Sequence, residues 1–276
     1  MAKNKYILGI DLGGTYIKYG LATKHGRLIK LEQVVTPSTQ EKIINLFIKI
    51  IKSYQNKISK VGLGLPGRLD IKRGLILSNR DLPLSNTPIV KLIKQKIKLP
   101  IKIDNDARCF VLAESLVGAG KNYQTVVGLT LGTGVGGGIV INKKLYHGKG
   151  NAGELGHQFI DFQNKKDLED YLGARRQKLT AKDYQNLANL AHQRDKKAVF
   201  FWKKIGQVLG FGIINIIHTL DPEVIILGGK LPKNYNLFYA EVKTLIKKYC
   251  LTNPPKIVKS KLIDKAGVIG ATLLFK

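Results

Sequence analysis

The stretch Ile7–Thr15, with the sequence ILGIDLGGT, is a hydrophobic run that ends in paired glycines. A second stretch of the same kind, Leu129–Gly138 (LTLGTGVGGG), lies much later in the chain. Another hydrophobic run follows the glycines each time, so both stretches predict a strand, a glycine turn and a second strand. Glycine lets backbone N–H groups close around phosphate oxygens. Two such turns facing one cleft predict a protein that binds a polyphosphate and transfers a phosphoryl group.

Other nucleotide-binding folds fit the residues less well. Gly132, Gly134 and Gly137 match the G-x-G-x-x-G spacing of dinucleotide-binding folds, but those folds need a helix directly afterwards. The β-branched run Ile139–Ile141 follows instead. A Walker-type P-loop and the sequence motifs of protein kinases are also missing. The open alternative is that the glycines only form tight turns.

The composition is that of a globular protein long enough to form two lobes, with 276 residues of which 44% are hydrophobic. Cys109 and Cys250 are the two cysteines, which is typical of a reducing cytoplasm, and we expect both in buried helical packing. No apolar run reaches the length of a membrane span, and Met1–Lys5 lead straight into the first expected strand. We therefore expect a cytoplasmic protein with no membrane partner, no leader and no N-terminal DNA-binding segment.

The net charge is extreme, at +27 from 46 Lys and Arg against 19 Asp and Glu. Such a field favours anionic partners, including nucleotides, polyphosphate and nucleic acid. The lysines are spread along the whole chain, and in Lys91–Lys98 they alternate with apolar residues as on the solvated face of a helix. A general lysine bias is therefore the alternative interpretation, and we expect no specific nucleic-acid partner.

The order of the expected elements indicates an α/β fold. Strands are expected near 6–10, 16–23 and 28–35, a helix over 43–51 and a strand over 61–65, an order that implies a parallel crossover. A short strand at 101–104 and a helix at 107–117 precede the glycines at 118 and 120. After these come the second hairpin, helix over much of 179–219, a strand at 224–227, and helices at 236–250 and 266–275. We predict an N-terminal lobe at 1–117 and a C-terminal lobe at 118–276, with the last helix packing back on the first lobe.

Two carboxylates stand where phosphoryl transfer needs them. Asp11 ends a strand just before the first glycine turn, and a carboxylate beside phosphates favours a cation between them. We predict that it positions Mg²⁺ through water; capping of the turn is the alternative. Asp106 precedes a helix, either as its N-cap or as a general base that accepts the proton of an attacking hydroxyl. Asn105 would then orient the substrate, and Asp104 should point to the opposite face.

Further polar residues flank these two positions. Thr15 offers a hydroxyl to a phosphate, and Lys18 offers a neutralising charge; a solvated lysine is the alternative at position 18. Glu154 and His157 are three residues apart, so one turn can aim both at a ligand; the alternative is that both are surface residues of a loop. Glu169 is unremarkable by itself and fits a solvated helix position.

Taken together, six motifs resemble those of the ROK family (repressors, open reading frames, kinases), which belongs to the superfamily of sugar kinases, actin and heat-shock ATPases. The resemblance covers essentially the full length. Its motifs in this sequence are Gly9–Thr15, Gly62–Gly67, Asn105–Ala107, Leu131–Gly138, Ala152–His157 and Asp221–Gly229.

The resemblance implies two ribonuclease-H-like (actin-like ATPase) lobes around a central cleft, and an ATP- and Mg²⁺-dependent hexokinase-type reaction, most often on glucose. Asp106 matches the base that activates the sugar 6-hydroxyl, and Asp11 matches the Mg²⁺-phosphate aspartate. The resemblance also implies sugar contacts and nucleotide contacts. The implied sugar contacts are Gly67, Asn79, Asn105, Asp106, Glu154, His157 and Glu169. The implied nucleotide contacts are Asp11, Gly13, Gly14, Thr15, Lys18, Gly132, Thr133 and Gly134, with Gly228 and Gly229 as the turn under the adenosine.

The sequence departs from the family pattern in two places. Many members have a cysteine-rich zinc loop after the Gly-His motif, whereas 158–166 is short and holds no cysteine. We therefore expect no structural zinc, and a loop that is held by packing. The stretch Ser78–Pro83 stands where members have a tryptophan-bearing loop, so Asn79 is assigned by position only.

Three hypotheses remain at this point. The first is an ATP-dependent glucokinase, for which the family implies a homodimer. The second is a glucokinase that uses polyphosphate, which the net charge of +27 would suit. The third is a sugar-responsive regulator or binding protein without catalysis, against which the intact Asp106 argues.

Overall fold

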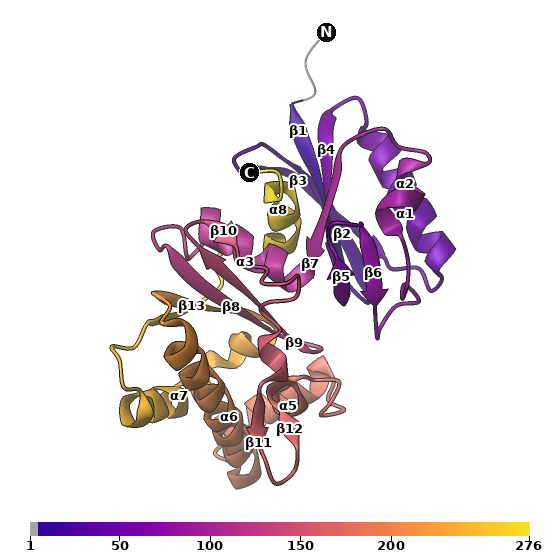
Figure 1. Ribbon diagram of the computed structural model, residues 1–276. Coiled ribbons are helices and arrows are strands. Elements are labelled where there is room, and N and C mark those ends of the chain that lie inside the picture. Colours follow the sequence, from indigo (N-terminus) through magenta and orange to yellow (C-terminus); the bar gives the residue numbers. More distant parts are fainter. Residues whose placement is uncertain (1–4) are drawn as a thin grey trace.

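The first sheet is built around strand β1 (Tyr6–Leu12), the strand that runs into the first glycine turn (Figure 1). The structure is a computed structural model that describes residues 5–276, so residues 1–4 of the predicted N-terminal lobe lie outside the described part. The strand order is β3 (Leu28–Val35), β2 (Tyr16–Ala22), β1, β4 (Ile58–Leu65) and β7 (Ile101–Asn105). The first three strands pair antiparallel, and β1, β4 and β7 pair parallel. The predicted strands and the parallel crossover are confirmed.

The second sheet repeats this arrangement. Its order is β10 (Lys144–Leu145), β9 (Val135–Ile141), β8 (Thr125–Leu131), β13 (Val224–Gly229) and β14 (Lys256–Lys259). Strands β8 and β9 form an antiparallel hairpin across the second glycine turn, and β13 lies parallel to β8. In both sheets, then, a glycine hairpin lies beside a parallel strand, which is the duplication that the sequence predicted.

Amphipathic helices cover the outer sides of the sheets. Helix α1 (Gln40–Tyr54) begins at Thr39, whose hydroxyl accepts a hydrogen bond from the Lys42 N–H, and it buries Ile43 and Phe47 in the first core. The short α2 (Ile89–Lys94) exposes its lysines, as predicted. The helices of the second sheet are α5 (Ala181–His192), α6 (Lys196–Leu220) and α7 (Tyr235–Tyr249).

The helical stretch expected at 179–219 is two helices. Arg194 adopts a left-handed backbone conformation, with φ of 64°, and the Asp195 side chain caps α6 by accepting from the Ala198 N–H at 2.8 Å. Helix α6 is the one helix within residues 5–276 that is long and apolar enough to cross a membrane by length and composition. Most of its apolar residues, including Trp202 and Leu209, are buried in the second core, whereas Phe200 and Phe211 are exposed.

Two helices, α3 (Asp106–Val117) and α8 (Ala266–Leu273), lie between the sheets (Figure 1). Their backbones approach closely: a methyl group added at Gly270 would lie 1.8 Å from the Cys109 carbonyl oxygen. One added at Gly62 of β4 would lie 1.8 Å from the Ala271 carbonyl oxygen. Helix α8 therefore lies directly against the first sheet, although it ends the chain.

The remaining elements are short. Strands β5 (Arg68–Asp70) and β6 (Leu75–Ser78) form one ribbon, and β11 (Phe159–Asp161) and β12 (Lys166–Asp167) form another. Helix α4 is Leu168–Leu172, and three single turns of 3₁₀ helix are η1 (Leu155–His157), η2 (Leu231–Asn234) and η3 (Ile263–Lys265).

The two cysteines differ in their surroundings. Cys109 lies on α3 and is buried where this helix packs against α8, as predicted. The prediction for Cys250 is wrong, because this residue ends α7 in a half-buried position, where its Sγ lies 3.3 Å from the Thr252 carbonyl oxygen.

Candidate active site

The first glycine turn connects β1 to β2 and is held by its own backbone. The Gly13 N–H donates to the Tyr16 carbonyl at 3.0 Å, and the Gly13 carbonyl accepts from the Thr36 hydroxyl at 2.7 Å. Gly14 and Thr15 are exposed, and a methyl group at Gly14 would meet no atom within 4 Å. The open side of this turn is therefore at Gly14 and Thr15, while Gly13 holds the turn together.

The second glycine turn connects β8 to β9 and is held by backbone hydrogen bonds from the segment after α4. The Gly132 N–H donates to the Gly134 carbonyl, and the Gly132 and Thr133 carbonyls accept from the Ala174 and Arg175 N–H groups, all three at 3.0 Å. Thr133 is exposed. Since the carbonyls of this turn face the segment after α4, its other side is free to receive a ligand.

Glu169 lies against this second turn. Its Oε2 accepts a hydrogen bond from the Val135 N–H at 2.9 Å, and a methyl group at Gly134 would lie 2.6 Å from the same oxygen. Arg176 Nε is 3.6 Å from the other carboxylate oxygen. The alternative that Glu169 is a solvated helix position is therefore wrong, because its carboxylate supports the turn that carries Thr133.

Asp11, at the end of β1, lies in a recess formed by glycines. Its carboxylate occupies the space that a side chain on Gly267 would fill, at 2.2 Å, and would be in van der Waals contact with one on Gly64, at 3.6 Å. Burial and the negative charge of Asp106 together raise the pKa of Asp11 to about 7, against the lowering effect of Lys18. The two aspartates of the predicted site are therefore close enough to influence each other.

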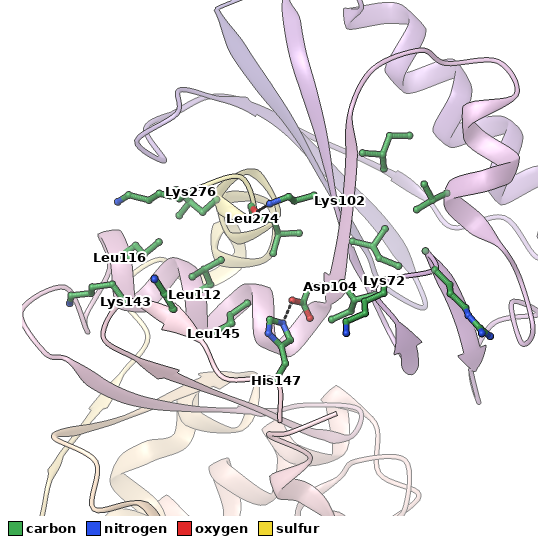
Figure 2. Close-up of a pocket in the computed structure, with 18 of the residues that line it drawn as sticks. Lys72, Lys102, Asp104, Leu112, Leu116, Lys143, Leu145, His147, Leu274 and Lys276 are labelled. Atoms are coloured by element: carbon green, nitrogen blue, oxygen red, sulfur yellow. Dashed lines mark hydrogen bonds and ion pairs between the residues drawn. The ribbon is translucent and has the colours of Figure 1, made fainter. Parts of the chain in front are cut away.

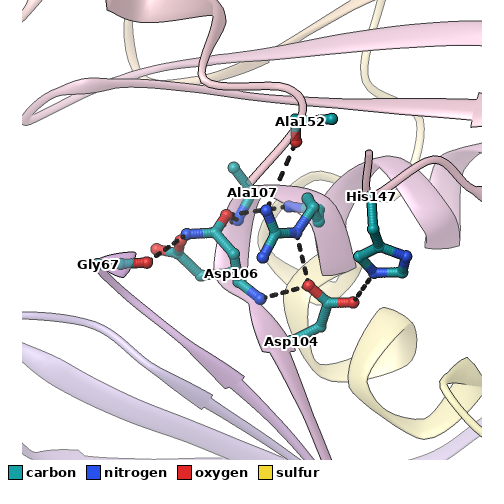
Figure 3. A network of polar contacts seen from close by, with 8 residues as sticks. Gly67, Asp104, Asp106, Ala107, His147 and Ala152 are labelled. Atoms are coloured by element: carbon teal, nitrogen blue, oxygen red, sulfur yellow. Dashed lines mark hydrogen bonds and ion pairs between the residues drawn. The ribbon is translucent and has the colours of Figure 1, made fainter. Parts of the chain in front are cut away.

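Asp106 begins helix α3, and its neighbour Asn105 is the N-cap (Figure 3). The Asn105 Oδ1 accepts from the Ala107 and Arg108 N–H groups at 2.9 and 3.3 Å. The alternative that Asp106 serves as the cap is therefore wrong. Burial, together with the charge of Glu154, raises the pKa of Asp106, and this exceeds the lowering effect of its bond from the Ala107 N–H.

Asn105 and Asn79 use most of their amide groups inside the protein. The Asn105 Nδ2 donates to the Gly67 carbonyl at 3.3 Å, which fixes the turn after β4 beside the start of α3. The Asn79 Nδ2 donates to the Pro66 carbonyl at 2.8 Å, and its Oδ1 accepts from the N–H groups of Asp81 and Leu82. Each amide therefore has one N–H left for a ligand.

Glu154 and His157 lie on the loop that ends in η1, and both are exposed. The effect of Glu154 on the pKa of Asp106 places the two carboxylates near each other. The His157 Nδ1 lies 2.8 Å from Asp167 Oδ2, a residue that the sequence analysis did not assign. The expectation that this loop is held by packing is therefore incomplete, because a hydrogen bond from the imidazole also holds it.

The residues predicted under the adenosine have different surroundings. Gly229 ends β13 with φ of 88° and is exposed, as a turn beside a ligand requires. Gly228 is buried, and a side chain there would lie 2.4 Å from the Phe110 ring. The structure therefore explains Gly228 by close packing against α3.

Lys18 is near the site but already has a partner. Its Nζ lies 3.1 Å from Asp264 Oδ1 in η3, and its side chain is 27% exposed. This ion pair connects β2 to the segment before α8, while Lys18 also lowers the pKa of Asp11. Neutralisation of phosphate charge by Lys18 stays a prediction.

Asp104 and His147 lie on the other side of β7 from Asp106 (Figure 3), and they form a polar network with Arg108. Asp104 Oδ1 accepts from Arg108 Nε at 2.6 Å, and Asp104 Oδ2 lies 2.7 Å from His147 Nε2. Burial alone would raise the pKa of Asp104, but His147 and Arg108 lower it. Arg108 Nη1 also donates to the Ala152 carbonyl at 3.5 Å, so the network joins the first sheet to the loop before Glu154.

A cavity of about 920 Å³ lies beside this network (Figure 2). Asp104 and His147 line it together with apolar residues such as Leu112 and Leu145, and with lysines including Lys102. None of the residues predicted for the sugar or the nucleotide is part of its lining. It is therefore distinct from the candidate active site.

The residues present fit a magnesium nucleotide. No group of three or more His, Cys, Asp or Glu placed to hold a metal is found within residues 5–276. Mg²⁺, however, usually takes only one or two protein carboxylates together with water and phosphate oxygens. The recessed Asp11, whose pKa is raised by burial and by a second carboxylate, is a suitable donor for such an ion.

Sequence reasoning missed two buried groups that organise this site, Asp167 and Arg108. The spacing of Asp104 and Arg108 gave no signal, since Asp104 lies in β7 and Arg108 in α3, so the four-residue rule for one helix does not apply to them. Asp167 carried the N-cap pattern of an Asp three residues before another Asp. Its contact with His157 depends on how the β11–β12 ribbon folds, which spacing does not show.

Comparison with known proteins agrees with this geometry. The chain matches the ROK family over residues 7–276. It is 33% identical to the N-acetyl-D-glucosamine kinase of Photobacterium profundum, over 96% of this chain and 98% of that one. The ROK hexokinase of Thermus thermophilus has the same fold, with a TM-score of 0.85, 25% identity and 97% of both chains covered. A ROK glucokinase of Streptomyces griseus, solved with glucose and AMPPNP, has a TM-score of 0.81 and 26% identity, with 98% of both chains covered.

The two glycine turns, the paired aspartates between them and these full-length similarities lead to one conclusion. The fold is that of the actin-like ATPases, and the chain belongs to the ROK family as a sugar kinase.

Proposed function

We propose that the protein transfers the γ-phosphoryl group of ATP to the 6-hydroxyl of a hexose, with Asp106 as the general base. One observation carries the proposal: Asp106 and Asp11 lie near each other, at the ends of β7 and β1, beside two glycine turns. A base that removes the proton of a hydroxyl needs a carboxylate near the attacking oxygen. A phosphate-binding aspartate needs to stand beside the turn that receives the phosphates.

Each residue has a defined part in this reaction. The Asp106 carboxylate accepts the proton of the sugar hydroxyl as the new oxygen–phosphorus bond forms and the bond to ADP breaks. A raised pKa makes Asp106 a stronger proton acceptor than an ordinary aspartate. Mg²⁺ near Asp11 would neutralise phosphate charge. The open N–H groups at Gly14 and Thr133 would hold the phosphates from both sides.

N-acetyl-D-glucosamine is the first acceptor that we propose, and glucose, predicted from the sequence, is the second. The name of the Photobacterium relative favours the amino sugar, and that of the Streptomyces glucokinase favours glucose. The exposed Glu154 and His157, together with the half-buried Glu169, offer acceptors to the hydroxyls that both sugars share. Polyphosphate as donor and a homodimer both stay predictions.

The test combines each sugar with each donor. Purified protein with Mg²⁺ is given N-acetylglucosamine or glucose together with ATP or polyphosphate, and the sugar phosphate is quantified. We expect turnover with ATP and a higher kcat/KM for N-acetylglucosamine. Higher kcat/KM for glucose would reverse the order of acceptors, and no phosphorylated sugar in any combination would contradict the proposal.

Asp106→Asn tests the base assignment. The amide keeps the size of the side chain but does not accept the proton, so we expect kcat to fall by about 10²-fold or more. Sugar affinity, measured by calorimetry, should change little because Asn still hydrogen-bonds to a hydroxyl. A variant that retains substantial turnover would show that another group is the base.

A further inference from the structure

Asp167 connects the two short elements that carry the candidate sugar contacts His157 and Glu169. Its Oδ2 lies 2.8 Å from the Nδ1 of His157, which ends η1. Its Oδ1 accepts from the Asp170 N–H at 2.9 Å, in the first turn of α4, the helix that carries Glu169. Asp167 is buried, with 8% of its surface exposed, so little solvent competes for these bonds. One carboxylate therefore holds both elements in a fixed relation.

The contact also determines which imidazole nitrogen carries the proton. Burial alone would raise the pKa of Asp167, but the bonds from His157 and Asp170 lower it, so the carboxylate stays ionised at neutral pH. An ionised carboxylate accepts hydrogen bonds and donates none, so Nδ1 of His157 has to be the protonated nitrogen. In the neutral ring, Nε2 is then left as an acceptor.

The Nε2 atom is available to a ligand. Within residues 5–276 it has no hydrogen-bond partner, and the His157 side chain is 42% exposed. An acceptor at this position fits a hydroxyl or an amide N–H, the two donor groups of a hexose or an N-acetylated hexosamine. It does not fit a group that can only accept, such as a carbonyl oxygen.

We propose that Asp167 is a positioning residue for sugar recognition: it fixes the Nδ1–H tautomer of His157 and thereby makes Nε2 an acceptor for a donor group of the sugar. The inference rests on the proposed function, since it takes the hexose to bind at His157. It adds that His157 Nε2 accepts, and does not donate, the hydrogen bond with the sugar, and that Asp167 is the residue responsible.

Asp167→Asn tests the polarity directly. The amide oxygen can still cap α4, while the amide nitrogen, placed opposite His157, is a donor and favours the Nε2–H tautomer. We expect KM for the sugar to rise by about 10- to 100-fold, which corresponds to one mispaired buried polar group, while kcat changes far less. Asp167→Ser is the second variant, because serine keeps the N-cap but is too short and neutral to fix the imidazole.

Asp170→Asn is the matched control. Asp170 completes the capping box, since its Oδ2 accepts from the Asp167 N–H at 3.1 Å, but it has no bond to His157. This variant should lose some thermal stability and keep the wild-type KM. An equal rise in KM in the variants at 167 and 170 would show a general loss of structure and would overturn the proposal.

The tautomer is read by ¹⁵N NMR of the full-length protein with labelled histidine, without turnover. The chain has five histidines, and His157→Gln assigns the signal of interest. We expect an Nδ1–H signature in the wild type that is lost in Asp167→Asn. An unchanged signature together with an unchanged KM would overturn the inference.

If no hexose is phosphorylated but the tautomer still depends on Asp167, the proposed function fails while the link between the two side chains stands.

Discussion

At the scale of single residues, the feature with the widest consequences is the pair Asp11 and Asp106. Each has a pKa above its ordinary value because burial disfavours the charge, and the charge of Asp106 raises the pKa of Asp11 further. Such an arrangement costs stability in the free protein, and a bound cation would offset that cost. Acidic residues kept in an unfavourable place are characteristic of functional sites.

This cost should appear as a pH dependence of stability. The pKa of Asp11 is about 7 in the folded protein and 3.8 as an ordinary side chain. The folded state therefore holds the proton more tightly, and stability falls as the pH rises from about 4 through 7. Asp11→Asn removes that loss, so the free variant should be more stable than the wild type at pH 8, by up to about 4 kcal/mol.

Urea unfolding between pH 5 and pH 8 measures this effect. The advantage of the variant should shrink progressively toward pH 5, where Asp11 in the wild type is protonated. Asp221→Asn, at an exposed aspartate, is the control and should show the same difference from wild type at every pH. A variant at position 11 that gains nothing at pH 8 would show that the carboxylate is not held at a cost.

At the scale of elements, helices α3 and α8 determine how the two sheets come together. Glycines on α8 and β4 allow backbones to touch where any side chain would separate them. The same helix α3 begins at Asp106, and the segment before α8 holds Asp264, the partner of Lys18. The packing of these two helices therefore places Asp106, the proposed base, as well as the core.

Gly270→Ala tests this close approach. The added methyl group would lie 1.8 Å from the Cys109 carbonyl oxygen, so α3 and α8 would have to separate. We expect a loss of about 1 to 3 kcal/mol in the free energy of unfolding, despite the better helix propensity of alanine. The urea midpoint measures it.

Gly132→Ala is the comparison with the same chemical change. A methyl group there would meet no atom within 4 Å, so stability should stay within about 0.5 kcal/mol of the wild type. If Gly132→Ala lost as much as Gly270→Ala, close packing of α3 on α8 would not be the cause.

At the scale of the whole molecule, the net charge of +27 is the property that the fold explains least. The lysines of α2 lie on its exposed face, and others line the cavity behind β7. Carboxylates or carbonyls bind some of them, such as Lys18 and Lys102. The charge is thus spread over many surfaces, as in a non-specific positive field.

Duplex DNA should therefore bind weakly and without sequence preference. A diffuse positive surface binds phosphates by releasing counterions, so affinity should fall steeply between about 50 and 200 mM salt. Fluorescence anisotropy with two duplexes of unrelated sequence measures this. Tight binding of one duplex at 200 mM salt would contradict it and would indicate a specific nucleic-acid surface.

The sequence by itself determined the repeated pattern of the fold and identified the residues proposed for the site. Hydrophobic runs that end in glycines predict strands and turns from local sequence. The spacing of apolar residues and the backbone freedom of glycine each depend on only a few neighbouring residues. The two hairpins, the crossover and the placement of Asp11 and Asp106 at strand ends follow from such local rules. The break in the long helix at Arg194 was missed, because its left-handed residue is not a glycine.

Only the tertiary structure decided which polar groups meet. The bonds from Asp167 to His157, from Glu169 to the Val135 N–H and from Asp104 to His147 join segments whose separation follows no local period. Each depends on how a ribbon or a sheet brings distant residues together and excludes water from them. Sequence spacing identifies residues able to form such bonds, whereas burial and partners arise only when the two sheets have packed around α3 and α8.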